Sequence, residues 1–424
     1  MRDIIVTLIV VGAIPYVLMR PHIGILLWSW IGYMNPHRLA WGFATTMPFA
    51  QIIAIATLIS FVASKEPRTF PWTRETVLLL IFVAWMFITT LFALNSEGAW
   101  FQWDKVWKIQ LMTFVTMLVI NTEQRLHQLI WIICLSLGFY GIKGGVFTIL
   151  TGGSYHVWGP SNTFIGGNNE IGLAFIMLFP LLRYLHLTSE RTWLKMGLLG
   201  SMVLTFASIL GTQSRGALVG VVVMGGILLF KSRKKALFIP LIIVLALLGY
   251  QFMPESWHDR MSTIKTYEED ASAMGRINAW GFAMNLAMDR PILGGGFETF
   301  RPWIFYQYAP DPNAFHDAHS IYFEVLAEHG FIGLGLFLSL LGATFFSAGR
   351  CVKLAKLQGN KRMADMMSMI QVSLIGYGSA GAFLGLAYFD LVYHLIAITI
   401  VGKTLLIRLV AVSNTTDNRV EITS

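Results

Sequence analysis

The chain has 424 residues, of which 55% are hydrophobic and only 13% are charged, and its mean hydropathy is +0.62. This composition is typical of a polytopic membrane protein and excludes the ordinary soluble globular classes. The formal net charge of +8 does not indicate nucleic-acid binding, because the basic residues sort with the predicted membrane topology.

Apolar runs recur along most of the chain, and a transmembrane helix needs about 20 mainly apolar residues. The short apolar segment 22–34 is expected to be re-entrant or to pair with the first span. The sequence therefore predicts an all-α polytopic membrane protein with about 12 transmembrane helices. The predicted spans lie at roughly 4–20, 47–64, 76–94, 105–120, 127–150, 168–187, 194–211, 215–230, 236–253, 319–347, 369–386 and 391–411.

Lysines and arginines of the short connections gather on one side of this predicted topology. Sixteen lie in one set of connections, and only two, Arg38 and Arg215, lie in the opposite set. The positive-inside rule places the basic set in the cytoplasm, and an even number of spans then places both termini there. The basic set is 64–75, 121–127, 183–195, 231–235 and 350–362, and the opposite set is 35–46, 95–104, 151–167, 211–215 and 386–390.

One long soluble connection, 254–318, follows the ninth predicted span and is expected outside, in the periplasm. It divides the chain into a transmembrane bundle (1–253), the loop itself, C-terminal transmembrane helices (319–411) and a cytoplasmic tail (412–424). The loop holds nine Asp or Glu against five Lys or Arg, so it is net acidic. Anion binding there must therefore depend on individually placed arginines.

Within this loop, GRINAWGFAMNLAMDRP predicts a helix with Ile277, Trp280, Met284 and Met288 on one apolar stripe. Pro291 ends that helix, and the three glycines that follow predict a tight turn. The helix is expected to lie on the bilayer surface or to cap the bundle. Neither role accounts for the arginine at its start, Arg276.

Two cationic residues stand near the outer ends of predicted spans. Lys143 in GIKGGV either snorkels to the interface or marks a functional site. Arg215 in GTQSRGALVG either snorkels or caps carbonyls, or it clamps an anion in an external cavity. The outer loop 151–172, rich in Gly and Asn and ending near Glu170, suits sugar contacts as well as it suits an ordinary loop.

The stretch HDAHSIYFEVLAEHGFIG precedes and opens a predicted span, and its histidines admit three interpretations. His319 is a candidate general base, His316 is a weaker one, and either Asp317 or Ser320 suits the start of the helix. A metal site is the alternative, but zinc needs three or four ligands and no His-Glu-x-x-His or paired cysteines occur. Gly330 and Gly333 are expected to allow close helix packing, while Glu328 and His329 have no assigned role.

The few charged groups on the outer side suit a reaction whose leaving group is already activated. No P-loop, dinucleotide-binding fingerprint or Gly-x-Ser-x-Gly elbow is present. Transfer of a glycan from a lipid diphosphate to a hydroxyl needs arginines that hold the diphosphate and a base that removes one proton. A single displacement without a covalent enzyme intermediate implies inversion at the anomeric carbon.

HSIYFEVLAEHGFIG fits a pattern of His, then Asn, Ser or Gln, nine residues, and Gly-x-x-Gly, starting at His319. It resembles the C-terminal motif of O-antigen ligases, O-antigen polymerases and bacterial O-oligosaccharyltransferases. TQSRGALVG is similar to the Ser-Arg-Gly segment of that superfamily, and GRINAWGFAMNLAMDRPILGGGF to its Arg-x-x-x-Trp and Pro-x-x-Gly-x-Gly segment. MRDIIV and VWGPSNTFIGGNNE resemble a subgroup labelled O-glycosylation ligases. The resemblance covers essentially the whole chain.

The resemblance implies a GT-C-like fold and a metal-independent glycosyltransferase without cofactor, in the inner membrane of a Gram-negative bacterium. The donor would be an undecaprenyl-diphosphate-linked glycan and the acceptor a hydroxyl of lipid A–core. His319 would be the general base, Arg215 would bind the diphosphate and assist catalysis, and Arg276 would bind the diphosphate. Our own reading adds Lys143, Arg290 and Arg301 as further candidates for binding the diphosphate.

Two other functions remain open at this point. The same motifs serve an O-antigen polymerase or a protein O-oligosaccharyltransferase, which differ only in their acceptor. A transporter of lipid-linked sugar is the alternative from another class. The ionisable residues Lys143, Glu170, Asp390 and Lys403 in or beside predicted spans are compatible with it, although the two halves show no clear repeat.

Overall fold

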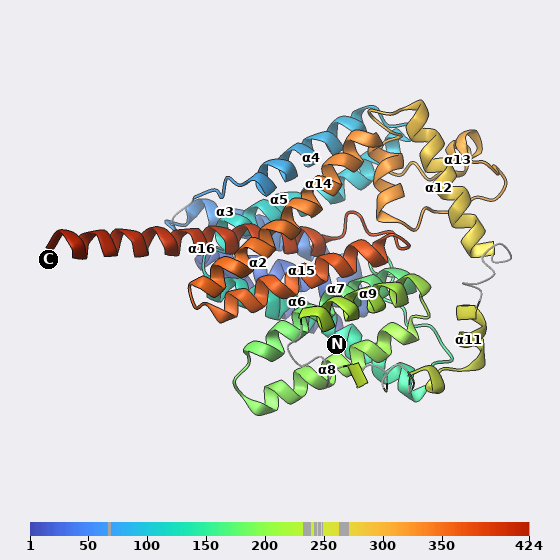
Figure 1. Cartoon of the computed structure of the whole chain (residues 1–424). Coiled ribbons are helices and arrows are strands. Elements are labelled where there is room, and N and C mark those ends of the chain that lie inside the picture. Colours follow the sequence, from blue (N-terminus) through green and yellow to red (C-terminus); the bar gives the residue numbers. More distant parts are fainter. Residues whose placement is uncertain are drawn as a thin grey trace.

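The computed structural model describes residues 1–66, 69–231, 239, 240, 244, 247, 249–262 and 271–423. Throughout this part of the chain the regular elements are helices (Figure 1). They are α1 (Arg2–Met19), α2 (Pro21–Met34), η1 (Pro36–Leu39), η2 (Phe43–Thr45), α3 (Phe49–Ala63), α4 (Arg74–Leu91), α5 (Ser96–Val119), α6 (Glu123–Leu150), α7 (Asn168–Thr188), α8 (Thr192–Gly211), α9 (Arg215–Lys231), α11 (Glu255–Ser262), α12 (Ala271–Asp289), α13 (Pro302–Tyr308), α14 (Ile321–Leu357), α15 (Lys361–Gly381) and α16 (Asp390–Thr423).

Among the described residues, seven helices are long and apolar enough to cross a membrane. They are α1, α4, α6, α7, α8, α14 and the Asp390–Leu409 part of α16. The expected polytopic, all-helical membrane protein is thus confirmed. The predicted spans outside this set correspond to α3, α5, α9 and α15, and the predicted span 236–253 lies largely outside the described residues.

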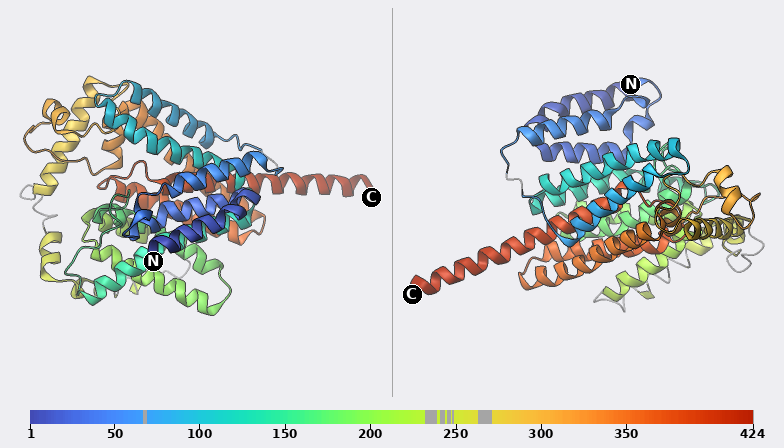
Figure 2. Two further views of the ribbon diagram at one scale, coloured as in Figure 1. Left: turned by 180° about the vertical axis from the view of Figure 1, so that it is seen from behind. Right: turned by 90° about the horizontal axis from the view of Figure 1, so that it is seen from above.

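The chain's two termini lie at opposite ends of the helix bundle (Figure 2). The Arg2 guanidinium donates to the Leu39 carbonyl (3.1 Å), and Arg38 lines the same cavity as His319, so the N-terminus lies at the His319 end. The expected placement of both termini on one side is therefore corrected. The reason is α2: with 14 residues it is short, but it carries the chain back along α1 to the His319 end.

A buried ion pair ties three helices together at the end of the bundle opposite His319. The Glu75 carboxylate on α4 is fully buried and accepts hydrogen bonds from Ser347 Oγ on α14 (2.5 Å) and Lys403 Nζ on α16 (2.9 Å). A buried charge is costly unless it is paired and hydrogen-bonded. Lys403, a candidate for the transport alternative, thus has a structural partner.

Helix α14 is broken at Gly330, whose φ of 67° and ψ of −171° are not helical. The break leaves backbone carbonyls of α14 without partners inside the helix. The three glycines of the long loop (294–296) form the glycine turn, and two of them donate hydrogen bonds to these carbonyls. Gly295 N donates to the Ala327 carbonyl (2.7 Å), and Gly296 N donates to the Glu328 carbonyl (2.8 Å). The glycine turn and the helix after His319 are therefore one backbone junction. Gly330 was expected to allow close packing between helices, but it breaks α14 and lies against Pro291 and Ile292 of the loop.

Replacing Gly330 with alanine should destabilise the protein by about 3 kcal/mol, because this backbone conformation is nearly restricted to glycine. A Cβ there would also lie 2.5 Å from the Ile292 carbonyl oxygen. The matched control is Gly335→Ala on the same helix, where a Cβ meets nothing within 4 Å. Thermal unfolding in detergent should show a lower apparent Tm for Gly330→Ala only. Equal Tm values for both variants would contradict the tight junction.

The helix expected in the long loop is present as α12, but three of the four residues of its predicted stripe are exposed. Phe282, on a different face, is fully buried and stacks on Phe305 of α13 (ring centroids 4.9 Å apart). Of the stripe, Met284 and Met288 are exposed, whereas Trp280 packs against α14. The helix has two apolar faces, and the one with the alanines and Phe282 packs more closely. Of the predicted stripe, only Trp280 packs against the bundle.

The segment 382–389 between α15 and α16 is irregular, although 369–386 was predicted as a span. Irregular backbone inside a membrane protein is tolerated where it lines a cavity. Here a Cβ added to Gly385 would lie 4.0 Å from His319 Cα, and a Cβ added to Gly216 would lie only 3.0 Å from the Leu384 side chain. The segment therefore packs both against the start of α9 and against His319.

Candidate active site

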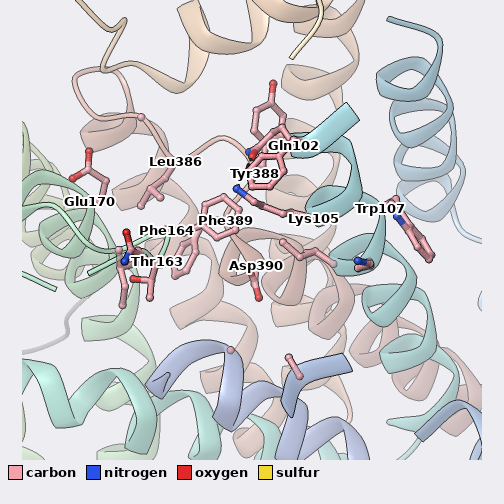
Figure 3. Close-up of a pocket in the computed structure, with 18 of the residues that line it drawn as sticks. Gln102, Lys105, Trp107, Thr163, Phe164, Glu170, Leu386, Tyr388, Phe389 and Asp390 are labelled. Carbon is pink, nitrogen blue, oxygen red and sulfur yellow. Dashed lines mark hydrogen bonds between the residues drawn. The ribbon is translucent and has the colours of Figure 1, made fainter. Parts of the chain in front are cut away.

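A cavity of about 1390 Å³ lies at the His319 end of the bundle (Figure 3). Pockets for drug-sized ligands occupy about 300–1000 Å³, so this cavity suits a larger molecule. Its wall is formed by α2 and the segment after it, α3, α5, the loop before α7 with the first turn of α7, the segments on either side of α13, the first part of α14, and the segment 385–390. Its ionisable lining residues are Arg38, Lys105, Lys108, Glu170, Glu298, Arg301, Asp317, His319, Glu324, Glu328 and Asp390.

His319 lines this cavity immediately before α14, with a left-handed backbone (φ 41°). Such conformations are uncommon for residues other than glycine and often occur at functional sites. Its Nδ1 lies 4.0 Å from Glu170 Oε1 at the start of α7, and its ring meets that of His316 edge-on at 5.5 Å. A Cβ added to Gly385 would lie 4.0 Å from His319 Cα, so the segment 382–389 runs next to this residue.

The surroundings of His319 favour its neutral form. Burial, together with the positive charges of Arg276 and His316, lowers the pKa of His319 to about 4. Beside it, burial raises the pKa of Asp317, and the negative charge of Glu298 acts in the same direction. At neutral pH the His319 imidazole is therefore uncharged and has a lone pair available to accept a proton.

Arg276 lies near His319 and Arg215 lies at the start of α9, and neither lines the cavity. Arg276 is half-buried in the second turn of α12 and is close enough to lower the pKa of His319 by its charge. Arg215 is half-buried at the first position of α9, which Ser214 Oγ caps by accepting from Ala217 N (3.3 Å). The structure thus places Arg276 close to His319, and Arg215 at the start of α9, whose Gly216 lies against Leu384.

The three candidates added from our own reading have different positions. Arg290 donates to the Phe92 carbonyl at the end of α4 (2.7 Å), which gives it a structural role. Arg301 lines the cavity and pairs with Glu298 (2.5 Å). Lys143 is exposed on α6 and does not line the cavity.

Two glutamates one helical turn apart face the cavity from the first part of α14. Glu328 is buried and accepts from Tyr388 Oη (2.6 Å) and from Glu298 N (2.8 Å). Glu324 accepts from Ala387 N (3.3 Å). They join the helix to the segment 382–389, a role that sequence reasoning missed. Their spacing could have indicated this role, because two residues four apart lie on one face of a helix and both glutamates belong to the motif that begins at His319.

Within the described parts of the chain, no three His, Cys, Asp or Glu side chains are grouped so that they could hold a metal ion. His316 and His319 face each other through their ring edges, and Glu170 approaches only one of them. The metal alternative therefore finds no ligand set in the part of the chain that the structure describes.

Two family matches divide most of the chain between them. Residues 1–189 match a family of unknown function, DUF5935. Residues 200–338, which include Arg215, Arg276 and His319, match the family described as O-Antigen ligase. The chain carries an O-antigen ligase domain. No curated protein matches the chain.

The O-antigen ligase domain assigns the chain to membrane glycan transfer of the O-antigen ligase or polymerase type, with lipid-linked glycans as substrates. The domain contributes Arg301, Asp317 and His319 to the cavity. The DUF5935 region contributes Lys105 and Glu170, which lie on opposite sides of the cavity (Figure 3). The cavity is therefore shared by both matched regions.

Proposed function

We propose that the protein is an inverting glycosyltransferase that moves an O-antigen glycan from undecaprenyl diphosphate to a hydroxyl of lipid A–core. The observation that carries the proposal is a neutral histidine, His319, on the wall of a large cavity beside Arg276 and within an O-antigen ligase domain. The His319 end would then face the periplasm, where both lipid-linked substrates are accessible.

In the proposed reaction, the oxygen of the acceptor hydroxyl attacks the anomeric carbon of the donor glycan. The neutral His319 imidazole takes the hydroxyl proton as the new carbon–oxygen bond forms. The bond between the anomeric carbon and the diphosphate breaks, and its electron pair leaves with the diphosphate. Arg215 and Arg276 would hold that leaving group, because guanidinium groups bind phosphate oxygens bidentately and stabilise developing negative charge.

Glu170 is suited to support the histidine during this step. Its carboxylate oxygen lies 4.0 Å from His319 Nδ1, on the side away from Lys105 (Figure 3). When the imidazole becomes positively charged, a nearby carboxylate stabilises the charge and orients the ring. Glu170 would thus be a positioning residue. Under this proposal its presence beside a span is explained without a role in transport.

The proposal is tested with purified protein, undecaprenyl-diphosphate-linked glycan and lipid A–core. We expect glycan-capped lipid A–core and free undecaprenyl diphosphate in equal amounts, and activity that persists in excess chelator. Longer lipid-linked glycan without capped lipid A–core would instead indicate a polymerase. Glycan transfer to protein hydroxyls alone would indicate an O-oligosaccharyltransferase. If the lipid-linked glycan only moved between leaflets, without a new bond, the transporter alternative would replace the proposal.

A further inference from the structure

A second group of charges lies in the cavity on the wall formed by the DUF5935 region. Arg38 follows α2, and Lys105 and Lys108 lie one turn apart on α5; all three line the cavity. The side chain of Lys105 extends from α5 toward Phe389, with Glu170 on the far side (Figure 3). We call Arg38, Lys105 and Lys108 the basic cluster.

Most of the cavity's carboxylates lie away from the basic cluster. Those of Glu170, Asp317, Glu324 and Glu328 lie on the walls around His319, where Arg301 is paired with Glu298. The basic cluster lies on the wall formed by α5 and the segment after α2, and Asp390 lies beside α2, where a Cβ on Gly32 would be 3.4 Å from its Oδ2. An anionic group is repelled by the carboxylates and attracted by the cluster. The cavity therefore favours a ligand with hydroxyls near His319 and negative charge near α5.

Two members of the basic cluster have no carboxylate partner among the described residues. Lys105 Nζ contacts only uncharged groups, the Gln102 side chain (3.5 Å) and the Phe101 ring (4.1 Å). Arg38 is exposed and has no ion pair in the described part of the chain. Lys108 is paired with Asp104 (2.7 Å), and both are about half exposed. The cluster can therefore accept an anion without first breaking a buried pair.

Next to the basic cluster, the cavity continues as an apolar groove between α3 and α5. Its lining there includes Ala54, Ile55 and Leu58 of α3 and Leu111 and Met112 of α5. Ile55, which lines the groove, is 50% exposed, so the groove reaches the apolar outer surface of α3. An apolar groove that is continuous with the basic cluster fits a lipid whose chains lie in the groove and whose anionic head group contacts the cluster.

We propose that the basic cluster and the groove between α3 and α5 bind the acceptor of the reaction, as a lipid whose head carries phosphate groups. This rests on the proposed function, in which Arg215 and Arg276 hold the donor diphosphate; neither lines the cavity, so the groove is left to the acceptor. The acceptor enters from the bilayer with its chains along α3 and α5. Its phosphates rest on Arg38 and Lys105, and its sugar hydroxyls extend to His319. The DUF5935 region thereby selects the acceptor.

The double variant Arg38→Gln, Lys105→Gln tests this site by direct binding to the purified full chain in detergent. The probes are lipid A–core, the same glycolipid after phosphatase treatment, and undecaprenyl-diphosphate-linked glycan. We expect the Kd for intact lipid A–core to rise roughly tenfold or more, as for the loss of hydrogen bonds to charged groups, and to rise with salt in the wild type. The Kd for the lipid-linked glycan should not change. The control Lys353→Gln removes an exposed charge far from the cavity and should leave both Kd values unchanged.

Phosphatase treatment gives a second measurement that does not depend on the variant. The wild type should bind the treated glycolipid as weakly as the double variant binds the intact one, and the two losses should not add. Equal affinity for intact and treated glycolipid would overturn the proposal. Weaker binding of the lipid-linked glycan instead would assign the groove to the donor and also overturn it. Because binding is measured without turnover, failure of glycan transfer itself would be seen separately.

Discussion

Replacing His319 with alanine should reduce glycan transfer by roughly 10²- to 10⁴-fold, the usual contribution of a general acid–base group. Without the imidazole, no group at that position accepts the proton of the attacking hydroxyl. The variant should still insert into membranes and bind undecaprenyl-diphosphate-linked glycan, because the proposed diphosphate ligands are Arg215 and Arg276. Single-turnover transfer with preloaded donor, together with the donor Kd, measures both parts of this expectation.

The control for this experiment is His156→Ala, a histidine in the loop before α7 that does not line the cavity. Its transfer rate should stay near that of the wild type. His316→Ala separates the two neighbouring histidines, whose rings are 5.5 Å apart. Full activity of His319→Ala would remove the general-base role, and loss in His316→Ala alone would move that role to His316.

Replacing Arg276 with glutamine should raise the KM for the lipid-linked donor and lower kcat/KM by roughly 10- to 100-fold, since hydrogen bonds to charged groups are among the stronger ones. Arg215→Gln should have a similar effect. Arg276→Lys keeps the charge but lacks the planar fork, so its activity should lie between those of the wild type and the glutamine variant.

The same substitution should change the pH dependence of the reaction. Burial, with the charges of Arg276 and His316, lowers the pKa of His319 to about 4. The base is therefore neutral above that pH, and kcat/KM of the wild type should fall only as the pH drops through about 4. Removing the Arg276 charge raises this pKa, so the acidic limb of the profile should move to higher pH.

Arg290→Gln is the matched control, because Arg290 lies in the same loop but donates to the Phe92 carbonyl (2.7 Å). It should lower the apparent Tm without raising the donor KM or moving the acidic limb. An Arg276→Gln enzyme whose donor KM and pH profile both equal those of the wild type would show that Arg276 neither binds the diphosphate nor acts on His319.

The sequence indicated His319, Arg215 and Arg276 through short motifs. The structure places Arg276 close to His319 and Arg215 at the start of α9. The sequence did not identify Glu328, because a buried glutamate is recognised by its partners, Tyr388 Oη and Glu298 N, which come from distant segments. The cavity wall formed by α5 was missed for the same reason. Lys105 was inside a predicted span and resembled no motif, and only its position opposite Glu170 makes it a candidate.

The sequence alone determined the class of the protein and the chemistry of its motifs. Apolar runs specify membrane helices wherever water is excluded, because each backbone polar group must then be paired within the helix. Local patterns also located the loop helix α12 and the glycine turn.

Tertiary structure decided the rest, because it depends on contacts between segments far apart in the chain. It placed the termini at opposite ends through the short helix α2, left most of the predicted stripe of α12 exposed, and ended α15 at Gly381. It also joined the glycine turn to the break at Gly330 through backbone hydrogen bonds between the two. Hydropathy describes how apolar each segment is, whereas tertiary packing determines which face of a helix contacts which neighbouring segment. That choice created the shared cavity around His319.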